Sequence, residues 1–232
     1  MRIKLIACPL VLEKLSGRLD GVDVVVEELD IGLHKTPQKL KDALQCAVDE
    51  TPGDFDAIVL GYGACANAVV GLKAFACPII VPRVDDCIGI FLGSRRAYRA
   101  EMKNNPGTYY LTKGWIDAKQ SPFDEFDDMC EQFGRERAGK LMKTMLAHYS
   151  RLALIRGEDE EEFDTYRLWA KETAEKFDLT YCELEGSGAL LDKIANGPWD
   201  DEFVVALPGE TIVLESFMDD AVAQNDVCAA GA

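Results

Sequence analysis

The amino-acid sequence predicts an α/β fold with a doubly wound, mostly parallel sheet, arranged in two Rossmann-like lobes. Two observations support this prediction. Short, nearly continuous apolar runs alternate with stretches of helical spacing along the 232 residues, as is typical of parallel strands covered by helices on both faces. The alternation resumes after a helical stretch near the middle of the chain, which indicates a second lobe of similar build.

The first half of the chain contains five apolar runs that we interpret as strands. They are expected at residues 3–7, 22–29, 57–60, 79–81 and 108–111. Helical spacing separates them over residues 10–19, 36–48 and 88–103. The second of these helices has the clearest start, because Thr36 is a suitable N-cap and Pro37 then occupies the first helical position. Leu40, Leu44 and Val48 lie along one face of that helix.

The second half repeats the pattern. Helices are expected at residues 123–133, 137–149, 160–177 and 190–196, and strands at 152–155, 179–184 and 203–206. The acidic first turn of the third helix suits the positive end of a helix dipole. We therefore expect an N-terminal lobe over residues 1–120, a helical connection with a second α/β lobe over 121–217, and a frayed acidic tail over 218–232.

Composition excludes several classes of partner. The chain has 41 acidic and 25 basic residues and a formal net charge of −16, which repels nucleic acid and anionic membrane surfaces. No apolar run approaches the ~20 residues that cross a bilayer. The first nine residues are typical of a strand and lack the apolar segment of a signal peptide. We expect a cytoplasmic protein that binds neither nucleic acid nor membranes.

Three of the eight cysteines lie in the loops that follow predicted strands, and Cys8 directly follows its strand. Cys8 follows the first strand, Cys65 the third and Cys87 the fourth. Functional groups of an open parallel sheet gather beyond the carboxyl ends of the strands. If the strand order is 2-1-3-4, these three strands are neighbours ~4.8 Å apart, and their loops can bring three thiols to one metal ion.

Three thiolates leave one position of a tetrahedral site open, which is typical of catalytic zinc and of a site-differentiated iron–sulfur cluster. The sequence does not decide between zinc and iron–sulfur. His34, after the second strand, is the candidate for a fourth ligand, and Asp85 or Asp86 is an alternative. A helix that begins near Cys87 is expected to lower the pKa of that thiol.

The same loops contain residues that we predict to contact a substrate. They are Tyr62, Gly63, Asn67, Arg83, Asp86 and Trp115. The glycine lets the backbone approach a ligand closely, and the tryptophan could form an apolar wall.

Each loop cysteine could instead be a small buried hydrophobe. The other five cysteines are expected to pack or to be exposed without a function. They are Cys46, Cys77, Cys130, Cys182 and Cys228.

Three motifs together resemble the family called domain of unknown function 1638. They are LGYGACAN at residues 60–67, PRVDDCI at 82–88 and GTYYLTKGWI at 107–116, and the resemblance covers roughly residues 1–215. It implies an origin in anaerobic bacteria or methanogenic archaea. It also implies a link to corrinoid-dependent methyl transfer, and therefore a small-molecule or protein-bound methyl or corrinoid partner. The resemblance supplies no catalytic residues.

Three functional hypotheses follow. The first is a cysteine-liganded metalloprotein, either an enzyme or a delivery protein. The second is a metal-free thiol enzyme, because the loop around Cys65 is similar to those of cofactor-independent amino-acid racemases. Such enzymes need a second, opposed cysteine, and the candidate in the second lobe, Cys182, lies within a predicted strand. The third is a non-catalytic module that binds a small ligand or a corrinoid protein.

Overall fold

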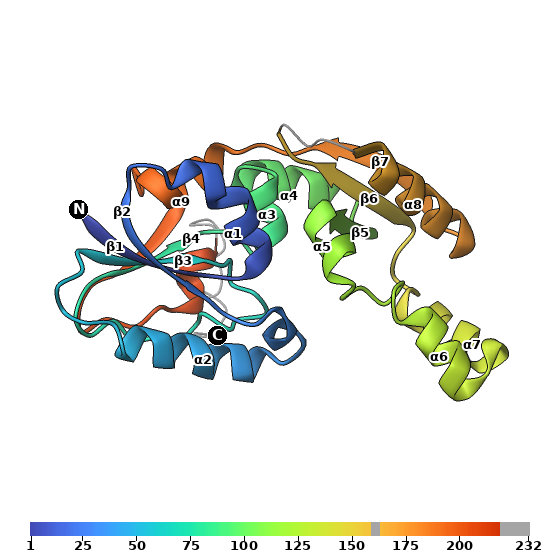
Figure 1. The fold of residues 1–232 in the computed structure, drawn as a ribbon, viewed down its shortest axis with the longest axis horizontal. Coiled ribbons are helices and arrows are strands. Elements are labelled where there is room, and N and C mark those ends of the chain that lie inside the picture. The colour runs from blue at the N-terminus through green and yellow to red at the C-terminus, as the bar shows by residue number, and fades with distance from the viewer. Residues whose placement is uncertain (159–162, 219–232) are drawn as a thin grey trace, which may run out of the picture. The chain divides into compact units, whose positions relative to one another are not determined.

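The computed structural model describes residues 1–158 and 163–218, and the chain divides into two compact units (Figure 1). Met1–Ile90 and the chain from Ala189 onward form the first unit, and Phe91–Gly188 form the second. The units therefore interleave in sequence. Their boundaries differ from the predicted one at residue 120 because the strand at 108–112 pairs within the second unit, whereas the last strand pairs within the first.

A five-stranded sheet in the order β2-β1-β3-β4-β8 forms the centre of the first unit. Its strands are β1 (Arg2–Ala7), β2 (Asp23–Glu28), β3 (Ala57–Gly61), β4 (Ile79–Pro82) and β8 (Phe203–Ala206). The first four run parallel in the order 2-1-3-4, which is the order that the three-cysteine hypothesis requires, and β8 is antiparallel to β4. The central strands β3 and β4 are buried along their whole length, as expected for strands covered on both faces.

Helices cover both faces of this sheet, which confirms the doubly wound class. The helices are α1 (Pro9–Leu15), α2 (Pro37–Asp49) and α9 (Ala189–Asn196), with 3₁₀ turns η1 (Ser16–Arg18), η2 (Ile31–Lys35) and η3 (Leu214–Phe217). Figure 1 shows α1 and α9 on one face and α2 on the other. The predicted apolar face of α2 is buried. The short helix α3 (Cys87–Phe91) spans the sequence boundary between the units.

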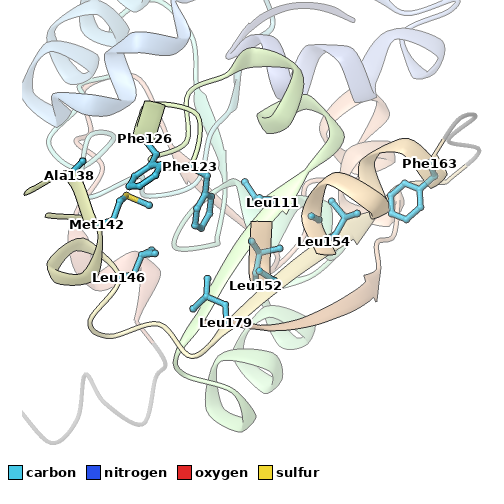
Figure 2. Packing of buried hydrophobic residues seen from close by; sticks show 12 residues of the cluster. Leu111, Phe123, Phe126, Ala138, Met142, Leu146, Leu152, Leu154, Phe163 and Leu179 are labelled. Carbon is cyan, nitrogen blue, oxygen red and sulfur yellow. The ribbon is translucent and has the colours of Figure 1, made fainter. Parts of the chain in front are cut away.

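The second unit contains a parallel sheet in the order β5-β6-β7. Its strands are β5 (Thr108–Thr112), β6 (Arg151–Arg156) and β7 (Thr180–Glu185), and its helices are α4 (Arg95–Asn104), α5 (Lys113–Ala118), α6 (Phe126–Phe133), α7 (Arg135–Met145) and α8 (Phe163–Lys176). Leu111, Leu152 and Leu154 from the sheet belong to one buried cluster with Phe126 and Met142 from α6 and α7 (Figure 2).

Two predicted helices are interrupted. The helix expected at 88–103 is divided into α3 and α4 because Gly93 has a φ of +81° and the Ser94 side chain caps α4 by accepting from the Ala97 N–H. A Cβ at Gly93 would lie 2.5 Å from the Ser187 Cβ, so glycine is required at that close approach. The helix expected at 10–19 ends at Leu15 and continues as η1.

The helix α5 was not predicted. The start of the helix expected at 160 and most of the tail expected at 218–232 lie outside the described residues. None of the helices in the described part of the chain has the length and apolarity needed to cross a membrane.

Candidate functional site

Three loops leave the first sheet at the carboxyl ends of β1, β3 and β4. The register pairs Ala7 at the end of β1 with Gly61 at the end of β3, and it pairs β3 with β4 in the same direction. Parallel neighbours lie ~4.8 Å apart, so the loops that contain Cys8, Cys65 and Cys87 start side by side. The structure therefore brings the three predicted loops together.

Cys8 occupies the junction between β1 and α1, where it is the N-cap residue of the helix. Its carbonyl oxygen accepts hydrogen bonds from the Val11 and Leu12 N–H groups, at 3.1 and 3.0 Å. The residue is 1% exposed. Burial raises the pKa of the Cys8 thiol, and the N–H groups at the start of α1 oppose that rise. Cys8 is thus a buried thiol held at a helix start.

The loop that contains Cys65 has an unusual backbone. Cys65, Ala66 and Asn67 all have left-handed conformations, with φ values of 46°, 54° and 67°. This conformation costs an L-residue roughly 1–2 kcal/mol, and it persists only where the surrounding structure imposes it. The sequence contains no glycine at these positions that would have indicated such a turn.

Hydrogen bonds to the next loop impose this conformation. The Ala64 N–H donates to the Val84 carbonyl and the Cys65 N–H donates to the Asp85 carbonyl, both at 2.8 Å. These bonds continue the pairing of β3 with β4 beyond the strands. Gly63 permits the approach, since a Cβ there would lie 2.7 Å from the Val84 carbonyl oxygen. The two cysteine loops are therefore locked to each other through their backbones.

Cys87 is the first residue of α3 and is 7% exposed. The preceding Asp86 holds this helix start, because its Oδ1 accepts from the Ile88 N–H at 2.9 Å. The backbone N–H groups of Gly63 and Cys87 hydrogen-bond to the Cys65 thiol. The Cys87 backbone is therefore one of the groups that act on the Cys65 thiol.

The Cys65 thiol is enclosed although the residue as a whole is half-buried. Burial is the largest cause that raises its pKa, and the charges of Asp86 and Cys8 add to the effect, so that the pKa reaches about 12. The N–H groups of Gly63 and Cys87 lower it in part. At neutral pH this group is a protonated thiol.

The Tyr62 hydroxyl is a buried polar group whose pKa depends on all three cysteines. Tyr62 is 1% exposed, and its hydroxyl has no hydrogen-bond partner within residues 1–158 and 163–218. Burial raises the pKa of this hydroxyl, and negative charge on Cys8, Cys65 or Cys87 raises it further. All three thiols therefore act electrostatically on this oxygen.

His34 and Glu28 also interact with Tyr62. The His34 ring lies 5.9 Å from the Tyr62 ring, centroid to centroid, and burial lowers the pKa of His34 so that the neutral imidazole is favoured. Sequence reasoning missed Glu28. This residue pairs with Ala7 in the sheet register, and its charge raises the pKa values of Cys8 and Tyr62. Its position at the end of β2, beside β1, could have indicated it.

The side chains are not arranged as a metal site in the present conformation. Within residues 1–158 and 163–218, no three Cys, His, Asp or Glu side chains are close enough together to hold a metal ion.

The remaining predicted contact residues are distributed more widely. Asn67 is exposed. Arg83 donates from Nε to the Ser216 carbonyl at 2.6 Å and from Nη2 to the Met218 carbonyl at 2.7 Å, so it holds the segment that follows β8. Trp115 belongs to the second unit, where it packs against the buried cluster of that unit.

The other cysteines are dispersed. Cys77 is buried at the opposite end of β4, just before the strand begins, and Cys46 is exposed on α2. Cys130 on α6 and Cys182 in β7 are half-buried in the second unit. Cys228 lies outside the described residues.

Comparison with known proteins identifies one family. The model of the family described as "Protein of unknown function (DUF1638)" matches residues 28–195, a segment that contains Tyr62, Cys65 and Cys87 but begins after Cys8. Neither a curated protein nor a solved structure matches the chain. The matched segment covers well over half of the sequence and includes the three motifs that first indicated this family. The chain therefore belongs to the DUF1638 family.

Proposed function

We propose that this protein is a metalloprotein in which Cys8, Cys65 and Cys87 ligate zinc or an iron–sulfur cluster and leave one coordination position open. One observation carries the proposal: three cysteines in loops after neighbouring strands act electrostatically on the buried Tyr62 hydroxyl, which has no hydrogen-bond partner in the described residues. Leaving a buried polar group unpaired costs roughly 1–3 kcal/mol. An ion or a bound molecule that supplies the missing partner explains why such a group is present.

Metal binding requires side-chain rotation at this site, because the thiols are not yet at ligating distances from one another. Zinc-bound sulfur atoms lie about 2.3 Å from the ion and hence on the order of 3.8 Å apart. Because backbone hydrogen bonds join the loops after β3 and β4, we expect the thiols to approach one another by side-chain rotation. When the three thiols ligate Zn²⁺, they release three protons, so that three thiolates and the ion have a net charge of −1.

His34 or a substrate would occupy the fourth position. His34 is near enough to the Tyr62 ring to compete for that position, and its neutral form is the one that ligates metals. If a substrate occupies the position instead, the metal acts as a Lewis acid toward it and the Tyr62 hydroxyl donates a hydrogen bond. The resemblance to a family linked with corrinoid-dependent methyl transfer makes a thiol methyl acceptor the first substrate class to test. We propose that the protein acts in the cytoplasm.

Metal quantification after anaerobic purification tests the proposal. We expect close to one equivalent of zinc, or of an iron–sulfur cluster with absorption near ~400 nm, in the wild type. Cys8→Ser, Cys65→Ser and Cys87→Ser should each lose most of the metal. Cys77→Ser is the matched control, since Cys77 is a buried cysteine at the opposite end of β4 and should leave the metal content unchanged. Less than about 0.2 equivalents of any metal in the wild type would contradict the proposal.

The metal-free thiol enzyme receives less support. A nucleophilic or basic cysteine needs a lowered pKa, whereas burial raises the pKa of both Cys65 and Cys182. Iodoacetamide labelling at neutral pH separates the hypotheses. Slow labelling of Cys65 in the metal-free protein agrees with a protonated thiol, and rapid labelling would favour the enzyme hypothesis.

A further inference from the structure

The second unit contains a cavity of about 540 Å³ between α6, α7 and the turn from α8 to β7. Apolar side chains supply most of its wall: Phe126, Met142, Leu146, Phe177 and Leu179. All of these residues belong to the second unit, whereas the cysteine loops after β1, β3 and β4 belong to the first. The cavity is therefore a feature separate from the proposed metal site.

The wall of the cavity belongs to the packed core. Phe126, Met142, Leu146 and Leu179 are members of the buried cluster, and Figure 2 shows Phe126 of α6 and Met142 of α7 turned toward each other. The Phe126 and Phe177 rings meet edge to face, with centroids 5.1 Å apart. Side chains fixed in this way keep a pocket open before a ligand arrives. The volume lies within the roughly 300–1,000 Å³ that is typical of small-molecule sites.

Two lysines line the cavity. Lys143 is exposed on α7 and has no ion-pair partner within residues 1–158 and 163–218. Lys176 is exposed at the end of α8, with its Nζ 4.6 Å from the centre of the Phe126 ring and 3.7 Å from an Asp127 carboxylate oxygen. One acidic residue, Asp178, also lines the opening. The charged residues that line the cavity, Lys143, Lys176 and Asp178, have a formal net charge of +1, in a chain whose net charge is −16.

We propose that this cavity binds a small amphipathic anion, with an aromatic or branched aliphatic body among the apolar side chains and a carboxylate beside Lys143 and Lys176. The rings of Phe126 and Phe177 and the thioether of Met142 suit an aromatic body, because sulfur and aromatic edges both pack favourably on rings. The lysines suit one negative charge at the mouth, where it keeps part of its hydration. This inference does not depend on the proposed metal site.

Titration with 4-phenylbutyrate and with 4-phenylbutylamine tests the proposal on the full chain. We expect the carboxylate to bind with a Kd below about 1 mM and the amine to bind at least about fivefold more weakly. We also expect nuclear Overhauser contacts between the phenyl protons and the Met142 methyl group. Equal binding of the two probes, or carboxylate binding without the Met142 contact, would overturn the proposal, as would the absence of binding.

Gly139 offers a variant that fills the cavity. This residue lines the cavity from within α7, and a Cβ there would meet no atom within 4 Å. Gly139→Leu should therefore weaken 4-phenylbutyrate binding by at least about tenfold. It should not lower the thermal midpoint, because leucine favours a helix more than glycine does. Gly17→Leu is the matched control, since a Cβ at Gly17 in the first unit also meets no atom within 4 Å. Unchanged binding by Gly139→Leu would count against the cavity as the site.

A substitution at Lys143 tests whether its charge contributes to the binding of the carboxylate. Lys143→Gln should weaken 4-phenylbutyrate about threefold and leave 4-phenylbutylamine no weaker, in keeping with the modest strength of exposed ion pairs. Lys140→Gln is the control on the same helix, because Lys140 pairs with Glu136 at 2.7 Å and does not line the cavity. Equal effects of the two substitutions would contradict a carboxylate held at Lys143.

Discussion

Replacing Gly63 by alanine tests whether the contact between the loops after β3 and β4 holds the candidate site together. A Cβ at Gly63 would lie 2.7 Å from the Val84 carbonyl oxygen, 2.8 Å from the Asp86 nitrogen and 2.9 Å from the Asp86 Cα. These are backbone atoms, so no side chain can rotate away and the loops must separate. The separation would weaken the hydrogen bonds that Ala64 and Cys65 donate to the second loop.

The expected loss of stability follows from these contacts. An added methyl group in a closely packed position costs about 1–3 kcal/mol. Weakening two backbone hydrogen bonds removes on the order of 1 kcal/mol more. We therefore expect Gly63→Ala to lower the free energy of unfolding by about 2–4 kcal/mol, a large fraction of the about 5–15 kcal/mol that stabilises a typical protein.

Urea unfolding followed by circular dichroism measures this change through the shift of the midpoint. Gly53→Ala is the matched control, because a Cβ at Gly53 would meet its nearest atom, the Ala76 Cβ, at an ordinary 3.9 Å. The control should stay within about 0.5 kcal/mol of the wild type. The reasoning is refuted if Gly63→Ala is as stable as Gly53→Ala, since the loops would then not depend on this close approach.

Three further predictions concern the same edge of the first sheet. Tyr62→Phe should stabilise the metal-free protein by about 1–2 kcal/mol in urea unfolding, because it removes a buried hydroxyl without a hydrogen-bond partner in the described residues. Burial raises the pKa of Cys65 from 9.0 to about 12, so the folded state favours the neutral thiol. The contribution of Cys65 to the free energy of unfolding should hence be fully present below about pH 9 and be lost toward pH 12. The loss amounts to up to about 1.4 kcal/mol per pH unit, and the slope should be smaller in Cys65→Ser. Arg83→Met should speed proteolysis near Ser216 and Met218 about tenfold or more, since two charge-assisted hydrogen bonds to that segment are lost.

Each of these predictions has its own control. Tyr166→Phe removes a hydroxyl that donates to Asp117 at 2.9 Å, so it should not stabilise the protein as Tyr62→Phe does. A Cys65→Ser variant with the same alkaline slope as the wild type would show that another group causes the loss. Arg18→Met removes a pair with Asp192 at 2.7 Å and should leave cleavage of the segment after β8 unchanged.

The strands of the first sheet were predictable from local pattern. Valine- and isoleucine-rich runs such as 79–82 are buried on both faces, and their alternation with helical segments leaves few arrangements for a parallel sheet. The break at Gly93 was not predictable, because its cause is the close approach of Ser187, which lies far away in the sequence. The same applies to β8, which returns from the end of the chain to pair with β4.

Some features of the candidate site were likewise predictable from the sequence, and others were not. The positions of Cys8, Cys65 and Cys87 at the ends of neighbouring strands followed from the sequence and the expected strand order. The sequence did not predict that Tyr62 is a buried group whose pKa depends on these cysteines. This role depends on where side chains point after the loops are packed. The left-handed turn at Cys65 likewise depends on hydrogen bonds from a different loop.

The amino-acid sequence by itself determined most of the secondary structure, the fold class and the family, because periodicity and turn residues act over a few positions along the chain. Only the tertiary structure decided which strands close each sheet, where the two units divide, and that an apolar cavity with two lysines lies beside α7. Those features arise from contacts between distant segments, whose packing and backbone hydrogen bonds no local pattern records.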